Sequence, residues 1–193
     1  MTQGNLLQVP QPEVNELAKG LLIGNRIPKD YFITHGVGES DITVHAGSYH
    51  LALKSAGIER ANIMTYSSIL PGIANEIPKP GLYEHGAVME SIMAVATGNC
   101  GNRVSAGIIY GWLKSRITGE RYGGLVCEHN GTYDLPELQR LLYASINELY
   151  YNGFEEDFEL LQPQVISESF VPEKRFGTAL VAICFTNYLY PLI

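Results

Sequence analysis

Two adjacent serines, Ser67 and Ser68, are the residues of this sequence whose types and position best suit chemistry. They follow a run rich in apolar residues that starts at Ala61, and Pro71 opens a stretch rich in glycine and proline. At such a junction the hydroxyl of Ser68 can attack the carbonyl carbon of Ser67, if the backbone brings the two atoms together. The acyl group then moves from nitrogen to oxygen, and β-elimination of the ester breaks the chain between Ser67 and Ser68. An ordinary turn is the alternative, because serine is common and favours turns.

Cleavage of this kind produces a group suited to amino acid decarboxylation. Dehydroalanine at position 68 would hydrolyse to a pyruvoyl ketone, an electron sink that does the work of pyridoxal phosphate elsewhere. The α-carbon must then be protonated, and Glu128 is a candidate because it ends the apolar run 125–127, where burial would raise its pKa. The amide of Asn62 can donate to an oxyanion or to the substrate. A solvent-facing glutamate and a structural asparagine are the alternatives.

Two other groupings of reactive side chains are less suited to catalysis. Cys127 and His129 flank Glu128, but in a strand they would share the face opposite to it, and the sequence shows no third group to orient them. A core cysteine and a rim histidine are therefore expected. His35, His45 and His85 have no metal-ligand spacing with one another, so no metal site is predicted.

Size and composition indicate one soluble domain with its own core. The chain has 193 residues, of which 46% are hydrophobic and 17% charged, and its net charge is −7. This charge and the absence of a Lys/Arg cluster argue against nucleic acid as a partner. The apolar runs are too short for a membrane span, and residues 1–28 lack the pattern of a signal peptide. Three cysteines without CxxC spacing indicate reduced thiols and a cytoplasmic location.

The predicted strands are β-branched and apolar runs bounded by glycine, proline and polar turns. They are residues 31–35, 61–66, 104–112, 122–128, 158–170 with a break at Pro163, and 177–188. The run 86–98 fits a strand or a helix by pattern alone. Residues 36–40 and 71–80 are predicted to be loops.

The clearest predicted helix covers residues 135–152, with Asp134 as its cap and Glu137 in the capping-box position. A second helix is expected over residues 47–55, and Gly57 can end it. Residues 1–28 are interpreted as an N-terminal extension with a short helix over 13–19, and residues 29–193 as the domain. Helices among antiparallel-type strands predict the α+β class.

Short segments in a fixed order make the chain resemble the pyruvoyl-dependent arginine decarboxylases, especially their bacterial branch. Besides Asn62 and the serine pair, they are residues 36–41 (GVGESD), 85–90 (HGAVME), 123–128 (GGLVCE) and 174–180 (KRFGTAL). The resemblance covers about residues 32–188 and favours a strand for the first half of 86–98. It implies an αββα sandwich with largely antiparallel sheets and a pyruvoyl group derived from Ser68.

The same resemblance implies functional roles and an assembly. Glu128 would donate the proton, Asn62 would act near the junction, and the reaction would convert L-arginine to agmatine and carbon dioxide. The substrate would be a small molecule, a free amino acid, and the assembly would be a homotrimer or hexamer with active sites between adjacent subunits.

His50 departs from the family pattern, in which an aspartate at this helix position binds the substrate guanidinium. A carboxylate accepts two charge-assisted hydrogen bonds from guanidinium, whereas a protonated histidine repels it. Either Glu39 or Asp41 therefore takes this role, or the substrate is another amino acid, unless the alignment slips within this helix. His50 also supports an alternative class, a non-catalytic relative that acts as a binding or assembly protein.

Overall fold

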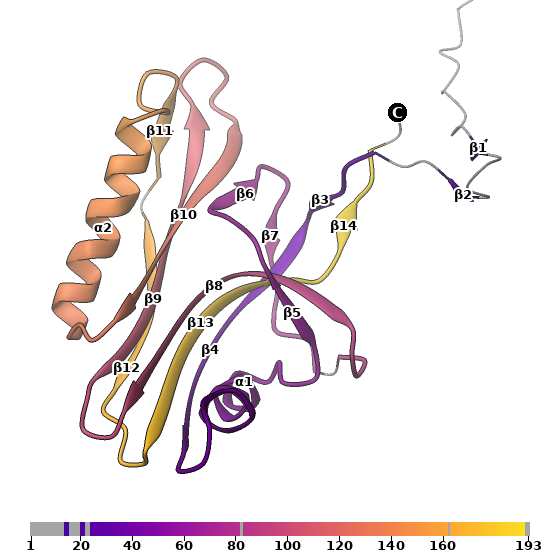
Figure 1. Cartoon of the computed structure of the whole chain (residues 1–193). Helices are drawn as coiled ribbons and strands as arrows, with labels where there is room; N and C mark the ends of the chain where they lie inside the picture. Colours follow the sequence, from indigo (N-terminus) through magenta and orange to yellow (C-terminus); the bar gives the residue numbers. More distant parts are fainter. Residues whose placement is uncertain (1–13, 16–19, 22–23, 82, 162, 192–193) are drawn as a thin grey trace, which may run out of the picture.

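The computed structural model describes residues 14–15, 20–21, 24–81, 83–161 and 163–191. Within these residues it is a mixed α+β protein with two α-helices, two five-stranded sheets and two small two-stranded sheets. Most strand pairs are antiparallel (Figure 1). The α+β class predicted from the sequence is confirmed.

The first large sheet has the strand order β5-β8-β13-β4-β7. Its strands are β4 (Asp30–Ser40), β5 (Asn62–Thr65), β7 (Asn75–Glu76), β8 (Val88–Asn99) and β13 (Phe176–Phe185). The central strand β13 pairs antiparallel with β4 and β8, while β5 and β7 add short parallel pairs at the two edges. The ambiguous run 86–98 is therefore a strand over most of its length.

The second large sheet has β9 and β10 at its centre. Its order is β11-β9-β10-β6, and β12 also pairs with β9. The strands are β6 (Ile69–Pro71), β9 (Val104–Ser115), β10 (Arg121–Gly131), β11 (Phe158–Leu160) and β12 (Gln164–Phe170). The predicted break at Pro163 is confirmed, because it separates β11 from β12.

Four short strands form the two small sheets. They are β1 (Val14–Asn15) with β2 (Gly20–Leu21), and β3 (Ile27–Pro28) with β14 (Tyr188–Leu189). The short helix predicted over residues 13–19 is wrong at residues 14–15, which form β1, and the rest of that prediction lies outside the described residues. The predicted last strand, 177–188, is divided between β13 and β14.

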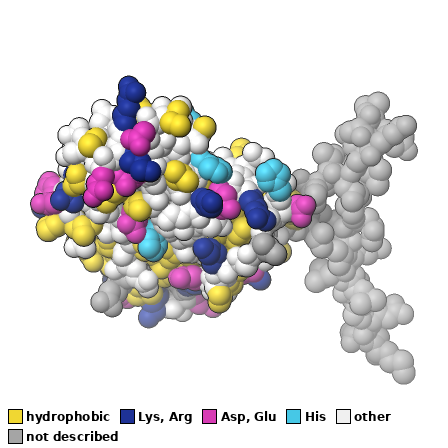
Figure 2. Space-filling view, turned by 90° about the horizontal axis from the view of Figure 1, so that it is seen from below, with side chains coloured by type: hydrophobic (Ala, Val, Ile, Leu, Met, Phe, Trp, Pro, Cys, Tyr) yellow, Lys and Arg dark blue, Asp and Glu magenta, His cyan; other side chains and the backbone are white. Residues whose placement is uncertain are grey.

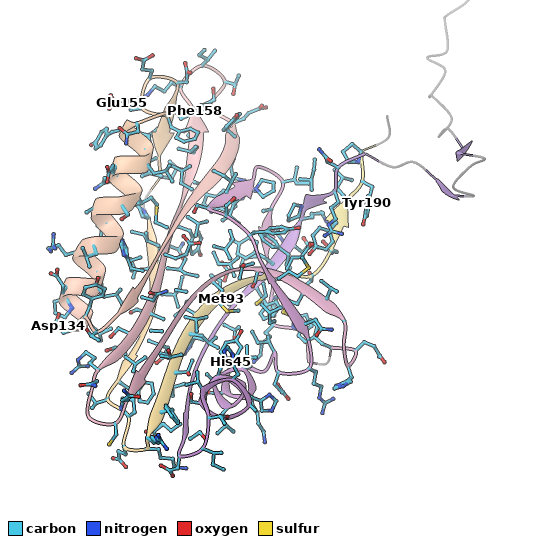
Figure 3. The ribbon with its side chains drawn as sticks, viewed as in Figure 1. His45, Met93, Asp134, Glu155, Phe158 and Tyr190 are labelled. Atoms are coloured by element: carbon cyan, nitrogen blue, oxygen red, sulfur yellow. The ribbon has the colours of Figure 1, made fainter. Side chains whose placement is uncertain are left out.

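The longer helix, α2 (Leu135–Tyr151), begins as its sequence predicts. Asp134 Oδ1 accepts the N–H of Glu137 at 2.9 Å, which satisfies one of the free donors at the helix start. Buried Leu138, Leu142 and Ile146 pack against the second sheet. Figure 3 shows Asp134 at one end of this helix and Glu155 and Phe158 near the other.

The shorter helix, α1 (His50–Ala56), follows a π-helical turn (Val44–Tyr49) and lies against β4 (Figure 1). Here the loop predicted for residues 36–40 is wrong, because β4 continues to Ser40. The glycines serve close packing instead: a Cβ on Gly38 would lie 2.3 Å from Ser48 O and 2.4 Å from Ala52 N. Glycine thus lets the backbone of the helix approach the strand.

Three apolar clusters account for the packing. One joins the two large sheets and includes Ile92 and Val181 from the first and Ile108 and Val126 from the second. Another lies between α1 and the first sheet, and the third lies between α2 and the second sheet. Side chains fill the space between the large sheets in Figure 3.

Candidate active site

The serine pair lies where the chain crosses from one large sheet to the other. β5 ends at Thr65 in the first sheet, and β6 begins at Ile69 in the second. On the first side, the N–H of Tyr66 donates to Ser91 O on β8 at 2.7 Å. On the second side, Ser68 O accepts the N–H of Val126 on β10 at 2.9 Å. The junction is therefore fixed to both sheets within two residues of the Ser67–Ser68 bond.

Glu128 and Ser68 are brought together by β10. Ile69 pairs with Leu125, so Ser68 lies beside the stretch of β10 that leads to Glu128. Ser68 Oγ donates to Glu128 Oε2 at 3.4 Å, a long hydrogen bond. Of the sequence-predicted site residues, these two are in direct contact.

The pKa of the Glu128 carboxyl is raised above its ordinary value. The main cause is burial, which disfavours the charged form, and the hydrogen bond from Ser68 acts in the opposite direction. The carboxyl keeps its proton to a higher pH than an exposed glutamate would. This is the property that a proton donor needs.

Cys127 and His129 lie on the other face of β10, as the alternation of a strand predicts. Cys127 packs in the cluster under α2, and His129 Nε2 is 2.8 Å from Ser145 Oγ on that helix. Burial raises the pKa of the Cys127 thiol to about 11, so it stays protonated at neutral pH. These two residues do not form a nucleophile–base pair.

Asn62 is the first residue of β5, whereas Ser68 follows the last residue of that strand. Its exposed side chain donates to Gly86 O at 2.8 Å, and its backbone N–H donates to Ala87 O at 2.8 Å. Within one chain, Asn62 therefore holds the segment before β8, and its predicted part in cleavage or substrate binding stays a prediction.

The three predicted substrate-binding residues are not gathered around Ser68 within one chain. Glu39 pairs with Gly177 on β13, whereas Ser91, which binds Tyr66, pairs with Cys184. These positions on β13 are seven residues apart, or about 23 Å at the rise of a strand.

Glu39 and Asp41 already have hydrogen-bond partners. Glu39 Oε1 accepts the N–H groups of Glu173 and Lys174 at 2.5 and 3.2 Å, and Asp41 Oδ1 accepts that of Arg175 at 3.1 Å. Both carboxylates thus support the turn before β13. The imidazole-bearing His50 is exposed at the first position of α1.

Sequence reasoning missed a charged pair beside the junction. Glu90 is only 2% exposed and forms an ion pair with Arg26, whose guanidinium also lies over the ring of Tyr188, 5.1 Å from its centroid. Glu90 pairs with Met64 on β5, two residues before Tyr66. A charged residue in the apolar run 88–96 was the available signal, but its distant partner Arg26 could not be read from the sequence.

The described residues hold no group of three or more His, Cys, Asp or Glu side chains arranged to bind a metal ion. Nor is any helix among them long and apolar enough to cross a membrane.

Comparison with known proteins gives the family. Residues 30–189 match the model of the family described as pyruvoyl-dependent arginine decarboxylase. A pyruvoyl-dependent arginine decarboxylase from Methanopyrus kandleri is 29% identical over 160 residues, which cover 82% of this chain and 97% of that protein. Pyruvoyl-dependent arginine decarboxylases AaxB from Chlamydia pneumoniae and Chlamydia trachomatis serovar L2 (strain 434/Bu) are 35% and 37% identical over 119 residues. Those alignments cover 55% of this chain and 60% of each chlamydial protein.

These matches establish the class of enzyme to which the chain belongs, the pyruvoyl-dependent carboxy-lyases. The match to the family model spans most of the chain, and the chain belongs to the pyruvoyl-dependent arginine decarboxylase family.

Proposed function

We propose that the chain cleaves itself between Ser67 and Ser68 and then decarboxylates L-arginine to agmatine and carbon dioxide. Family membership supplies the reaction. The observation that carries the assignment of residues is the contact of Ser68 Oγ with the partly buried carboxyl of Glu128. This contact supports Ser68 as the residue that is converted and Glu128 as the proton donor.

The residues present fit a pyruvoyl group derived from Ser68. The serine lies at a junction held by Tyr66 and Val126, so the chain can break there while β5 and β6 remain in their sheets. Once formed, the pyruvoyl group supplies the electron sink for loss of carbon dioxide. Glu128 then delivers a proton to the α-carbon of the product, because burial raises the pKa of its carboxyl and favours the protonated form.

The guanidinium of arginine needs an acidic partner that His50 does not provide. A hollow of about 290 Å³ beside Ile69 is unsuitable, because its lining carries no charge: Ile69, Leu70, Pro71, Leu113, Tyr122, Gly123, Gly124, Leu125 and Phe154. Glu39 and Asp41 lie at the far end of β4 in the same chain. We infer that one of them reaches the site from an adjacent subunit, or that specificity has moved to another amino acid.

Exposed apolar side chains around the junction support an assembly with active sites between subunits. Met64 of β5 and Ile69 of β6 are each 54% exposed, and Val88, which pairs with β5, is 61% exposed. Covering such side chains is favourable, and a homotrimer or hexamer would do so. The three free cysteines support a cytoplasmic location.

The layers and the partner class are also inferred. The three apolar clusters support the αββα sandwich, and all of their residues lie within the proposed domain, residues 29–193. Residues 1–28 are the proposed extension, and its last part is attached to the domain, because β3 pairs with β14 and Arg26 with Glu90. On the face drawn in Figure 2, acidic and basic side chains are interspersed. This pattern argues against nucleic acid as a partner, and a small-molecule substrate follows from the family.

Intact mass of the purified chain tests the proposal. Denatured wild type should resolve into residues 1–67 and a fragment that starts at position 68 and is blocked to Edman degradation. Ser68→Ala should remain one chain, because no hydroxyl is left to attack. A wild type that stays full length after long incubation would favour the non-catalytic relative, the alternative that His50 supports.

A further inference from the structure

The peptide unit between Ser68 and Ile69 is turned back onto the bond that must break. The N–H of Ile69 donates to Ser67 O at 3.1 Å, which closes a three-residue turn centred on Ser68. Ser67 O belongs to the carbonyl that the Ser68 hydroxyl attacks in the proposed self-cleavage. The hydrogen bond therefore polarises the reacting carbonyl before any step has occurred.

The register of β6 explains why this N–H is available. Ile69 is opposite Leu125. The N–H of Val126 donates to Ser68 O, so the neighbouring pair is hydrogen-bonded, and Ile69 and Leu125 form a non-hydrogen-bonded pair because the two kinds alternate. In such a pair, the N–H of Ile69 points away from β10. It turns instead to Ser67 O, and the same peptide unit is held from its other end by Val126.

We propose that the backbone N–H of Ile69 is the oxyanion donor for self-cleavage. In the acyl shift, Ser68 Oγ forms a bond to the carbonyl carbon of Ser67, and the carbonyl electron pair moves onto Ser67 O. The hydroxyl proton passes to the nitrogen of residue 68, the C–N bond breaks, and the ester remains. A fixed donor near 3 Å from the oxygen stabilises the charge that develops there.

This inference rests on the proposed self-cleavage and assigns the oxyanion donor to the backbone instead of to the Asn62 side chain. The amide of Asn62 was predicted to serve an oxyanion, but within the chain it is bound to Gly86 O. Among the described residues, Ile69 is the backbone donor recorded on Ser67 O. The donor comes from the backbone, so side-chain patterns could not reveal it.

The test removes one N–H from the full chain. Ile69 is replaced by its α-hydroxy acid, which exchanges the N–H for an ester oxygen and keeps the side chain. The same exchange at Leu70 is the matched control, since it perturbs the backbone of the same strand one residue away. Each protein is purified denatured and refolded, and the appearance of residues 1–67 is followed by intact mass. Far-UV circular dichroism checks the fold.

The exchange at position 69 should slow cleavage by about 10²- to 10³-fold, the usual effect of losing one oxyanion donor. The exchange at position 70 should have an effect of at most a few-fold. Equal rates for the position 69 exchange and wild type would overturn the inference, while the proposed function would stand. If wild type itself never cleaves, the proposed function fails first.

A second variant, Ile69→Pro, removes the N–H while keeping an amide bond, and it identifies the step that is slowed. If the acyl shift is slowed, no ester accumulates, and neutral hydroxylamine does not speed release of residues 1–67. Rapid release by hydroxylamine would mean that the ester forms normally without this donor. That result would overturn the inference even if the ester-linked protein fails to fold.

Discussion

Replacing Glu128 by glutamine removes the proton donor and changes little else. Glutamine has nearly the same shape and keeps an oxygen that can accept the hydroxyl of Ser68. The hydrogen bond between Ser68 Oγ and Glu128 Oε2 is long, 3.4 Å, so losing it would lower the free energy of unfolding by no more than about 1 kcal/mol. Burial already disfavours the charged carboxylate, and a neutral amide avoids that cost. We therefore expect Glu128→Gln to fold and to cleave itself.

Turnover should respond quite differently. An amide cannot deliver a proton to the α-carbon, and loss of a general acid typically lowers the rate about 10²- to 10⁴-fold. This corresponds to roughly 3–5 kcal/mol in the activation free energy, several times the structural effect. The assay is carbon dioxide release from arginine per mole of processed chain, with the processed fraction taken from intact mass. Glu159→Gln, an exposed acid on β11, is the matched control.

The pH dependence gives a second readout of the same residue. The raised pKa of Glu128 means that the folded protein holds this proton more tightly than the unfolded chain does. Both turnover and this contribution to stability are therefore complete at low pH and are lost as pH rises through the folded pKa. Glu128→Gln should lack that alkaline decline. Turnover within a few-fold of wild type, with an unchanged pH profile, would refute the assignment.

Three further predictions concern substrate recognition, packing and the thiol. If Glu39 or Asp41 binds the guanidinium, its amide variant should lose about 2 kcal/mol of binding free energy, which raises KM for arginine roughly thirtyfold. Improved arginine turnover in His50→Asp would show instead that specificity has moved to another amino acid. Gly38→Ala should lower the free energy of unfolding, measured in urea, by about 1–3 kcal/mol, because the added Cβ meets backbone atoms of the α1 region. The control Gly153→Ala should be near neutral, because the space around its Cβ position is open. Cys127→Ser should keep turnover within a few-fold of wild type, since the thiol faces α2 and remains protonated.

Local signals made α2 and most of the strands predictable. The cap at Asp134 and the apolar stripe through Leu142 act within one helix, so the sequence contains all the information needed. The stretch 36–40 was misread because two glycines usually indicate a turn. Its conformation depends on α1, which packs so closely on β4 that only glycine fits at Gly38. That contact joins separate elements and leaves no periodic pattern in the sequence.

The candidate site was predictable where its chemistry belongs to side chains. Ser68 and Glu128 are far apart in the chain, yet both stood out by residue type, and the structure brings them into contact. The supporting groups are different in kind: Ser91 O, Val126 N–H and Ile69 N–H belong to the backbone. Every residue except proline carries such groups, so only the strand pairing decides which of them reach the junction.

One strand, β10, sets the whole arrangement through its two-residue alternation. Val126 holds Ser68 O by its N–H, and Glu128, two residues on, presents its carboxyl on the face that meets Ser68. Cys127 lies between them and points to α2. A shift of one residue between β6 and β10 would turn the Ser68 side chain to the face of Cys127, away from the Glu128 carboxyl, because the longer pairing with β9 fixes the faces of β10. The register of this short pair therefore determines whether the protein has both a cleavable bond and an acid beside it.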